Sequence, residues 1–294
     1  MRKVLANLKP NERLRLGLPV SQNDVGDKAT NGETPRDHES QQFVELTDRV
    51  EYLTSPVLLT VTNFGFLDLL LNLLHSIHRL SNLQATILVV CEDRTAYTEL
   101  LKKQSNFTLK YQLALTHLEE SVINATDYRT QSYISLVQKR VSYVQLLLQR
   151  GLDVLYIDSD VVLLANPMKY FSDNKFDLFA QSEIESNRVL CAGFFYLRAN
   201  EKTKRFVRTW KRDLAKDPRG IQVTFNRQIK LFRANMKVSI LPINRFMSGK
   251  VFLKSEKPWF DRTPQPIEVH ANFMVGEGRK EDMLKTHHLW FVED

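Results

Sequence analysis

The stretch VLYIDSDVVLL, residues 154–164, places two carboxylates one residue apart between two apolar runs. Burying an unpaired charge is costly, so a core strand needs a reason to end in Asp158 and Asp160. Carboxylates that meet at a strand end offer the oxygen ligands that Mg²⁺ or Mn²⁺ prefers, and phosphate oxygens fill the remaining positions of such a cation. We interpret the pair as a metal site. The alternative is a surface turn whose aspartates only cap the next segment.

The residues before this stretch predict that it is a central strand. Segment 132–151 has apolar residues at helical spacing and ends in Gly151, which suits the left-handed end of a helix. Its apolar stripe consists of Tyr133, Val137, Val141, Val144 and Leu148. A strand at 153–157 follows directly, so Asp158 falls at its carboxyl end, which is the edge where ligands bind in open parallel sheets.

The rest of the chain alternates between short apolar runs and amphipathic segments. We expect strands at 56–63, 85–90, 107–115, 177–183, 193–200, 237–242, 251–254 and 267–272, and helices at 66–80, 95–104, 203–215 and 222–234. This alternation predicts an α/β fold with a mostly parallel sheet flanked by helices. Residues 1–50 are polar and aperiodic, so we expect a disordered leader or stem followed by one domain over 51–294.

Composition narrows the choice of partners. The chain has 41 Lys and Arg against 34 Asp and Glu, a net charge of +7. This charge suits an anionic substrate such as a nucleotide diphosphate or an acidic glycan, although a solvated basic surface is the simpler explanation. The basic residues are scattered and form no nucleic-acid motif, so no nucleic acid is expected. Cys91 and Cys191 have no CxxC partner, which favours two buried free thiols.

The sequence gives few signals about location. No run of about 18 apolar residues is present, and the basic N-terminus lacks the apolar core of a signal peptide. Asn106 and Asn124 stand in Asn-x-Thr triplets, which are glycosylation acceptors in the secretory pathway.

Two enzyme classes use an Asp-x-Asp pair in this way. In haloacid-dehalogenase-like phosphatases the first Asp is a nucleophile and the second a general acid. That class carries the motif on its first core strand, whereas about a hundred residues of expected α/β structure precede Asp158 here. The chain after Val161 also lacks an apolar strand ending in paired acids, so we disfavour the phosphatase.

The second class is indicated by a resemblance to a known family. Segment LLLQRGLDVLYIDSDVVLLANPMKYF, residues 146–171, resembles the core signature of the nucleotide-diphospho-sugar transferase family, which includes plant cell-wall α-xylosyltransferases and arabinosyltransferases. The likeness continues, in family order, through CAGFFYLRAN (191–200), QVTFN (222–226), LPINRFMSGKVFL (241–253) and VHANFMVGEGRK (269–280). It runs from about Pro56 to Trp290 and implies a GT-A-like, Rossmann-like fold.

The resemblance also implies site residues. Asp158 and Asp160 would bind Mn²⁺, or Mg²⁺, with His270 as a further ligand; a hydrogen-bonded core histidine is the alternative for His270. Gln222 and Asn226 are the candidates for catalysis at the donor sugar, or ordinary polar surface. The remaining candidates would contact the UDP-sugar: Thr60, Val61, Thr62, Asn63, Lys139, Arg140, Ser159, Gly193, Asn272, Gly276 and Lys280. Each of these also has an ordinary structural explanation as a strand, turn or solvated residue.

Two positions depart from the family pattern. Members commonly have an acidic residue directly before the glutamine of QVTFN, where this chain has Ile221. Ala192 stands where a small polar residue is more usual, and Asp217 lies four residues upstream of Ile221. A catalytically silent sugar-nucleotide or glycan-binding protein is therefore the second hypothesis.

The function that we expect is transfer of a pentose or hexose from a UDP-sugar to a hydroxyl of a glycan or glycoprotein. The resemblance implies retention of anomeric configuration and a place in the Golgi lumen, with the cytoplasm as the alternative. Membrane association is expected only through an anchor that this sequence does not show.

Overall fold

The structure is a computed structural model that describes residues 45–80, 83–104, 109–116, 131–186, 189–217 and 219–292, without the side chains of 131–137. The predicted leader up to residue 44, Asn106, Asn124 and the side chains of Tyr133 and Val137 lie outside the described residues. Among the described residues, no helix combines the length and the apolarity that crossing a membrane requires.

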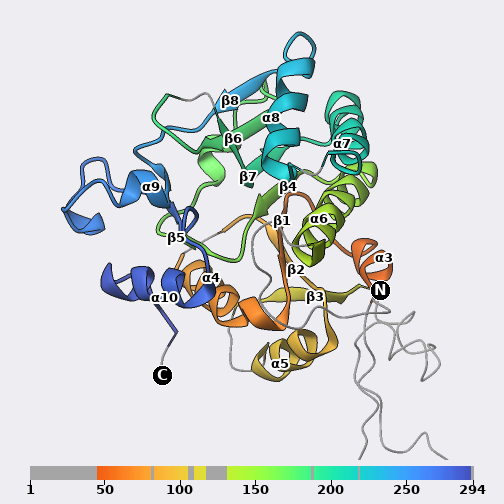
Figure 1. Cartoon of the computed structure of the whole chain (residues 1–294). Helices are drawn as coiled ribbons and strands as arrows, with labels where there is room; N and C mark the ends of the chain where they lie inside the picture. Colours follow the sequence, from red (N-terminus) through yellow and green to blue (C-terminus); the bar gives the residue numbers. More distant parts are fainter. Residues whose placement is uncertain are drawn as a thin grey trace, which may run out of the picture. The chain divides into compact units, whose positions relative to one another are not determined.

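A seven-stranded sheet forms the centre of the domain, in the order β3-β2-β1-β4-β7-β6-β8 (Figure 1). The strands are β1 Val57–Thr62, β2 Thr86–Cys91, β3 Tyr111–Leu115, β4 Val154–Ile157, β6 Leu178–Ser182, β7 Leu190–Leu197 and β8 Val238–Ile240. Strand β7 runs antiparallel to both of its neighbours, β4 and β6, whereas the other pairs are parallel. The predicted mixed, mostly parallel sheet is confirmed.

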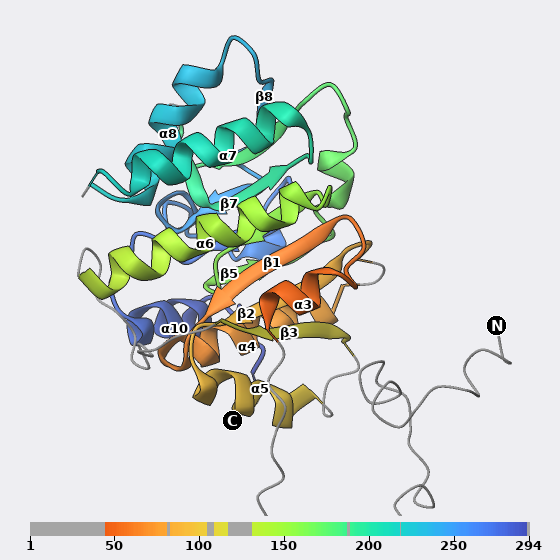
Figure 2. The same ribbon diagram turned by 90° about the vertical axis from the view of Figure 1, so that its right-hand side faces the viewer.

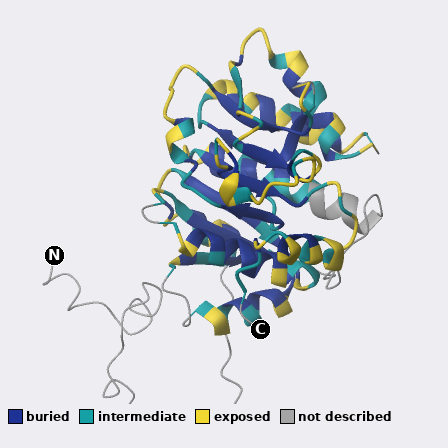
Figure 3. Cartoon of the chain, turned by 90° about the vertical axis from the view of Figure 1, so that its left-hand side faces the viewer, coloured by how far each residue is buried: buried dark blue, intermediate teal, exposed yellow. Residues whose placement is uncertain are grey.

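Helices cover both faces of this sheet (Figures 1 and 2). Helices α3 Leu46–Val50, α6 Gln131–Gln149, α7 Glu201–Leu214 and α8 Ile221–Phe232 pack on one face, and α4 Leu67–His78 and α5 Arg94–Gln104 on the other. Alternation along β1 divides the core in two, because Val57 and Leu59 join the first cluster and Leu58 joins the second. The strands are accordingly buried, apart from the partly buried edge strand β8, and exposed residues gather on helices and loops (Figure 3).

A second, three-stranded sheet brings the C-terminal part of the chain to the Asp-x-Asp segment. Strand β10 Glu268–His270 pairs antiparallel with β5 Val161–Leu163 and parallel with β9 Phe246–Ser248. The apolar residues of this sheet, Val162, Met247 and Val269, belong to one cluster with Leu69 of α4 and Leu284 of α10 Glu277–Thr286. The other short elements are α9 Gly249–Phe252 and the 3-10 turns η2 Phe64–Phe66, η3 Met168–Phe171 and η4 Trp259–Asp261.

Two sequence predictions were wrong. Residues 46–50 were assigned to the disordered leader, but they form α3, whose Leu46 and Val50 are buried against the sheet. Segment 251–254 was expected to be a strand, but α9 extends to Phe252. The hydroxyl of Ser248 caps this helix by accepting from the backbone N–H of Val251 (3.3 Å), and the strand lies earlier, at Phe246–Ser248.

The sheet topology gathers polar residues at one edge. Strands β1, β2, β4 and β6 all point the same way, so the residues that follow them lie at the same edge of the sheet. These residues are Asn63, Glu92, Asp158 and Glu183. The reversed strand β7 begins at this edge with Leu190, which places Gly193 opposite the end of β4.

Candidate active site

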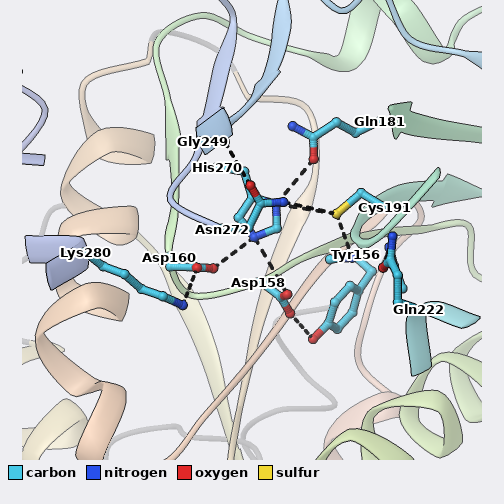
Figure 4. A network of polar contacts seen from close by, with 12 residues as sticks. Tyr156, Asp158, Asp160, Gln181, Cys191, Gln222, Gly249, His270, Asn272 and Lys280 are labelled. Carbon is cyan, nitrogen blue, oxygen red and sulfur yellow. Dashed lines mark hydrogen bonds and ion pairs between the residues drawn. The ribbon is translucent and has the colours of Figure 1, made fainter. Parts of the chain in front are cut away.

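A tight turn at the end of β4 presents both aspartates to one place (Figure 4). The backbone N–H of Asp158 donates to the carbonyl of Gly193 (2.8 Å), and the N–H of Val161 donates back to the carbonyl of Asp158 (3.2 Å). The carbonyl of Asp160 accepts from Ala271 (2.9 Å), the residue after β10. The turn is therefore fixed by β7 on one side and by the small sheet on the other.

The three predicted metal ligands lie together. One ligand atom from each of Asp158, Asp160 and His270 can be chosen so that all lie within 4.8 Å of one another. Nε2 of His270 is 3.1 Å from Asp160 Oδ1 and 3.8 Å from Asp158 Oδ2. Carboxylate oxygens with one imidazole nitrogen form a donor set that suits a divalent cation such as Mn²⁺.

The other nitrogen of His270 faces a second layer of polar groups. Nδ1 lies 3.3 Å from Oε1 of Gln181 and 3.5 Å from Sγ of Cys191. Gln181 in turn donates to the buried Glu268 (2.9 Å). Groups that hold the second nitrogen of a histidine fix the orientation of its ring, as they do at metal sites.

Positively charged side chains neutralise the two aspartates. Nζ of Lys280, on α10, donates to Asp160 Oδ2 (2.7 Å), and the Arg140 guanidinium, on α6, donates to Asp158 Oδ1 (2.5 Å). The hydroxyl of Tyr156 also donates to Asp158 Oδ1 (2.8 Å). These contacts explain how two carboxylates are accommodated at the end of a buried strand, because Asp158 pairs with a cation from the preceding helix and Asp160 with one from the C-terminal helix.

Electrostatic interactions favour the ionised forms of Asp160 and His270, although both side chains are buried. Burial alone would raise the pKa of Asp160, but Lys280 and His270 outweigh it and hold this pKa well below its usual range. Burial alone would lower the pKa of His270, but the adjacent Asp160 carboxylate raises it well above the usual value. Burial raises the pKa of Cys191 to about 12, so its thiol is neutral.

Position 193 has no room for a side chain, so glycine suits it. A Cβ atom at this position would lie 2.2 Å from Asp158 Oδ2 and 2.7 Å from His270 Cε1. The requirement is space, because the backbone of Gly193 does not have a positive φ. The predicted contact of Gly193 with the UDP-sugar stays a prediction.

The predicted residues on β1 lie at the same edge. Thr60 is fully buried, and its hydroxyl meets no hydrogen-bond partner among the residues that the structure describes. The hydroxyl of Thr62 donates to the carbonyl of Asn63 (3.0 Å); both residues are buried, and Val61 is partly buried. Their contact with the nucleoside stays a prediction.

Lys139 and Arg140 point to different places. Arg140 reaches Asp158, whereas Nζ of Lys139 lies 3.4 Å from Oε2 of Glu92, after β2. Glu92 is buried, and the hydroxyl of Tyr143 also donates to it. Burial raises the pKa of Glu92, against the lowering effect of these two partners. Since Glu92 N–H donates to Thr62 (2.8 Å), Lys139 lies beside the end of β1.

The last segment of the predicted site supports the loop before α10. Asn272 Oδ1 accepts from the N–H of Gly249 (2.8 Å). Gly276 has a φ of 93°, a left-handed conformation that glycine adopts freely, and it precedes the helix that carries Lys280. Ser159 is partly buried between the two aspartates.

Gln222 and Asn226 make contacts with the start of β7. The amide of Gln222 donates to the carbonyl of Leu190 (2.6 Å) and accepts from the N–H of Ala192 (2.9 Å). The side chain of Asn226 accepts from the backbone N–H of Leu190 and donates to the carbonyl of Leu190 (2.8 Å each). Both side chains therefore hold β7 in place, and their predicted role in catalysis stays a prediction.

The acid beside Gln222 is Glu183, which the sequence analysis missed. Its Oε1 accepts from Gln222 (3.1 Å), and its Oε2 accepts from Asn272 (3.1 Å). Ile221 is buried in the apolar cluster under α6 and α8, and Asp217 is paired with Arg219 and Arg227 away from Gln222.

The sequence contains a signal for Glu92 and Glu183, the two acids that it did not lead us to predict. Glu92 and Glu183 each follow a buried strand directly, as Asp158 does. The expected strand at 177–183 ends in Glu183, and Glu92 lies two residues beyond the expected strand at 85–90.

Solved structures of glycosyltransferases share this fold. The bifunctional glycosyltransferase WbbM superposes with a TM-score of 0.54 at 13% identity, covering 80% of this chain and 49% of that structure. The glycosyltransferase GlyE of Streptococcus pneumoniae superposes with a TM-score of 0.51 at 13% identity, covering 81% and 65%. At this identity the likeness concerns the fold alone.

The family follows from the sequence comparison. The model of the nucleotide-diphospho-sugar transferase family matches residues 82–284, so the chain belongs to this family and is a glycosyltransferase. The expected resemblance is confirmed.

Curated relatives are similar over most of this chain. The UDP-D-xylose:L-fucose alpha-1,3-D-xylosyltransferase 3 of Arabidopsis thaliana is 25% identical over 88% of this chain and 71% of its own length. The UDP-galactose:fucoside alpha-3-galactosyltransferase of Dictyostelium discoideum is 21% identical over 84% of this chain, which spans less than half, 45%, of that relative.

The space at Gly193 gives a first prediction. In Gly193→Ala, the added methyl group collides with Asp158 and His270, so binding of UDP in the presence of Mn²⁺ weakens by about tenfold or more. Gly278→Ala is the matched control, because a Cβ there meets nothing within 4 Å. Isothermal titration calorimetry measures both, and equal affinities for the two variants would contradict the account.

Glu277, the first residue of α10, makes the stability of the protein depend on pH. Burial and the nearby Asp68 and Glu281 raise the pKa of Glu277 to about 7, against the opposing effect of Lys280. The folded state thus holds this proton more tightly than the unfolded state, and stability falls as pH rises from about 4.5 to about 7. Glu277→Gln removes this loss.

The melting temperature of Glu277→Gln should therefore exceed that of the wild type at about pH 8, and the two should converge near pH 4.5. The exposed Glu256→Gln serves as control in the same thermal scans. A difference that is the same at both pH values would show that Glu277 is not the titrating group.

Proposed function

We propose that this protein transfers a pentose or hexose from a UDP-sugar to a hydroxyl of a fucose-containing glycan. The observation that carries the proposal is the cluster of Asp158, Asp160 and His270 at the carboxyl end of β4, with Lys280 and Arg140 beside it. The donor and acceptor are taken from two relatives, whose names specify UDP-xylose or UDP-galactose and fucose or a fucoside.

The three-residue cluster fits a divalent cation. Its donor atoms are carboxylate oxygens and an imidazole nitrogen, and Gly193 keeps side-chain atoms out of the space next to Asp158. Asp158, Asp160 and His270 would hold Mn²⁺ or Mg²⁺, whose positive charge would stabilise the negative charge that develops on the leaving UDP.

The chain's own cations would bind the diphosphate. Lys280 and Arg140 donate to the aspartates in this structure, and their N–H groups would be available to phosphate oxygens if the carboxylates held a divalent cation. Both come from helices that border the site, α10 and α6, so each can turn toward a ligand without a change in the sheet.

Glu183 would take the place of the acid that the family carries before Gln222. It is buried at the same edge of the sheet and is hydrogen-bonded to Gln222 and Asn272. A carboxylate there would accept a hydrogen bond from a donor-sugar hydroxyl and stabilise positive charge at the anomeric centre. This proposal favours an active enzyme over the catalytically silent binding protein that Ile221 suggests.

The stereochemical outcome would be retention. UDP-xylose and UDP-galactose carry an α-linked diphosphate, and the names of the two relatives describe alpha-linked products. A product with the same linkage here keeps the configuration of the donor.

A screen of UDP release tests the function. The donors tested are UDP-xylose, UDP-galactose, UDP-arabinose, UDP-glucose and UDP-N-acetylglucosamine, each with methyl α-L-fucoside and Mn²⁺. We expect turnover with UDP-xylose or UDP-galactose. EDTA should abolish it. Asp160→Asn should lose turnover and also the rise in melting temperature that UDP with Mn²⁺ gives the wild type, because it removes a ligand charge.

Asp173→Asn, on an exposed loop, is the control for that variant. Binding of UDP without turnover of any donor would support the silent binding protein. Absence of UDP binding would contradict both functions.

Glu183→Gln tests the acid separately. We expect kcat to fall by about 10²-fold or more, since a group that stabilises transition-state charge is worth about this much, with UDP affinity unchanged. Glu185→Gln is the matched control, two residues along the chain, where the carboxylate pairs with Lys254 on the surface. Equal kcat values for the two variants would leave Glu183 with a structural role only.

A further inference from the structure

The loop at 271–276 presents apolar side chains to solvent directly beside the site. Phe273 is 57% exposed and Val275 is 59% exposed, whereas Ala271 is fully buried. Asn272, the neighbour of Phe273, points into the site and is bonded to Glu183. Phe273 therefore directly follows a residue whose side chain is hydrogen-bonded to the acid that we place at the donor sugar.

The backbone of Phe273 has an unusual conformation. Its φ is 63°, in the left-handed region that is a rare and strained conformation for a bulky residue. Glycine would adopt it freely, so the chain keeps an aromatic ring here although another residue type suits the backbone better. Strain of this kind persists where the surroundings fix it, and it is frequent at ligand sites.

The surroundings of Phe273 do fix it. Asn272 is held by Gly249 at its Oδ1 and by Glu183 at its Nδ2. The packing of the loop on α9 is close, because a Cβ at Gly249 would lie 2.4 Å from the carbonyl oxygen of Asn272. Glu183 and α9 thus fix the position of Asn272, the residue before Phe273.

A cation lies beside the exposed ring. Nζ of Lys250, the second residue of α9, is 5.8 Å from the centroid of the Phe273 ring. An exposed aromatic face with an ammonium group next to it offers apolar contact and hydrogen-bond donors together. A pyranose ring has the complementary surface, a face of C–H groups surrounded by hydroxyls.

We propose that Phe273 and Lys250 form the subsite for the acceptor sugar. The apolar face of the acceptor pyranose stacks on the ring of Phe273, and Lys250 donates to its hydroxyls. A 6-deoxy sugar suits this subsite well, because its methyl group adds apolar surface toward Val275. The inference rests on the proposed function and adds the position of the acceptor to it.

Other occupants fit this position less well. The diphosphate would be bound at Asp160 and Lys280, and the nucleoside is predicted at the end of β1, on the main sheet. Within the loop 271–276 the exposed large apolar side chains are Phe273 and Val275, which is a small surface for a protein partner. A single sugar ring matches its size, and Asn272 connects the loop to Glu183.

Three variants test the subsite: Phe273→Gly, Phe273→Tyr and, as control, Tyr52→Ala. Initial rates are measured against the concentration of methyl α-L-fucoside at saturating donor, and against the donor at saturating acceptor. Tyr52 is an aromatic residue that is 67% exposed and lies before β1, at the opposite edge of the sheet.

We expect Phe273→Gly to raise the acceptor KM by about tenfold or more, with the donor KM within about twofold of the wild type. Its melting temperature should be equal or higher, because glycine relieves the left-handed conformation. Phe273→Tyr, which keeps the aromatic face, and Tyr52→Ala should keep the wild-type acceptor KM.

An unchanged acceptor KM in Phe273→Gly would overturn the subsite alone. So would an equal increase of both KM values, since that indicates a disturbed donor pocket. A wild-type protein that binds no UDP would instead overturn the proposed function, together with the inference that rests on it.

Discussion

The structure depends on neutralising two carboxylates at the end of one buried strand. Asp158 and Asp160 follow β4 at the centre of the sheet, and Asp160 is almost completely buried. Arg140, the partner of Asp158, comes from the preceding helix α6, whereas His270 and Lys280, the partners of Asp160, lie 110 and 120 residues further along the chain, on β10 and α10. Because an unpaired charge at this depth would be strongly destabilising, the C-terminal segment has to fold back onto the Asp-x-Asp turn for the domain to be stable.

The same constraint explains the reversed strand. Strand β7 runs against β4, so its first residues meet the turn after β4, and Gly193 leaves room for Asp158 and His270. Gln222 and Asn226 of α8 fix that beginning of β7 through its backbone. The region where we place the donor sugar is thus built on a strand end held by side-chain amides, with Glu183 as its acid.

The order of elements and the grouping of Asp158, Asp160 and His270 were predictable, because apolar runs such as 57–62 and the family motifs give strong signals. Shorter elements were not. The three-residue strand β9 has too few positions for a pattern, and VFLK at 251–254 looks like a strand until Ser248 is seen to cap a helix. Side-chain partners were also beyond the sequence, since the bond between Lys280 and Asp160 spans 120 residues.

The central claim is that Asp158, Asp160 and His270 hold the cation that carries the UDP-sugar. Anomalous diffraction at the manganese edge, from crystals grown with UDP and Mn²⁺, tests it most directly. The account predicts one strong peak between the two carboxylates and the imidazole, with diphosphate oxygens on its far side and within reach of Lys280. A peak elsewhere, or UDP bound at this edge of the sheet with no peak beside the aspartates, would contradict it.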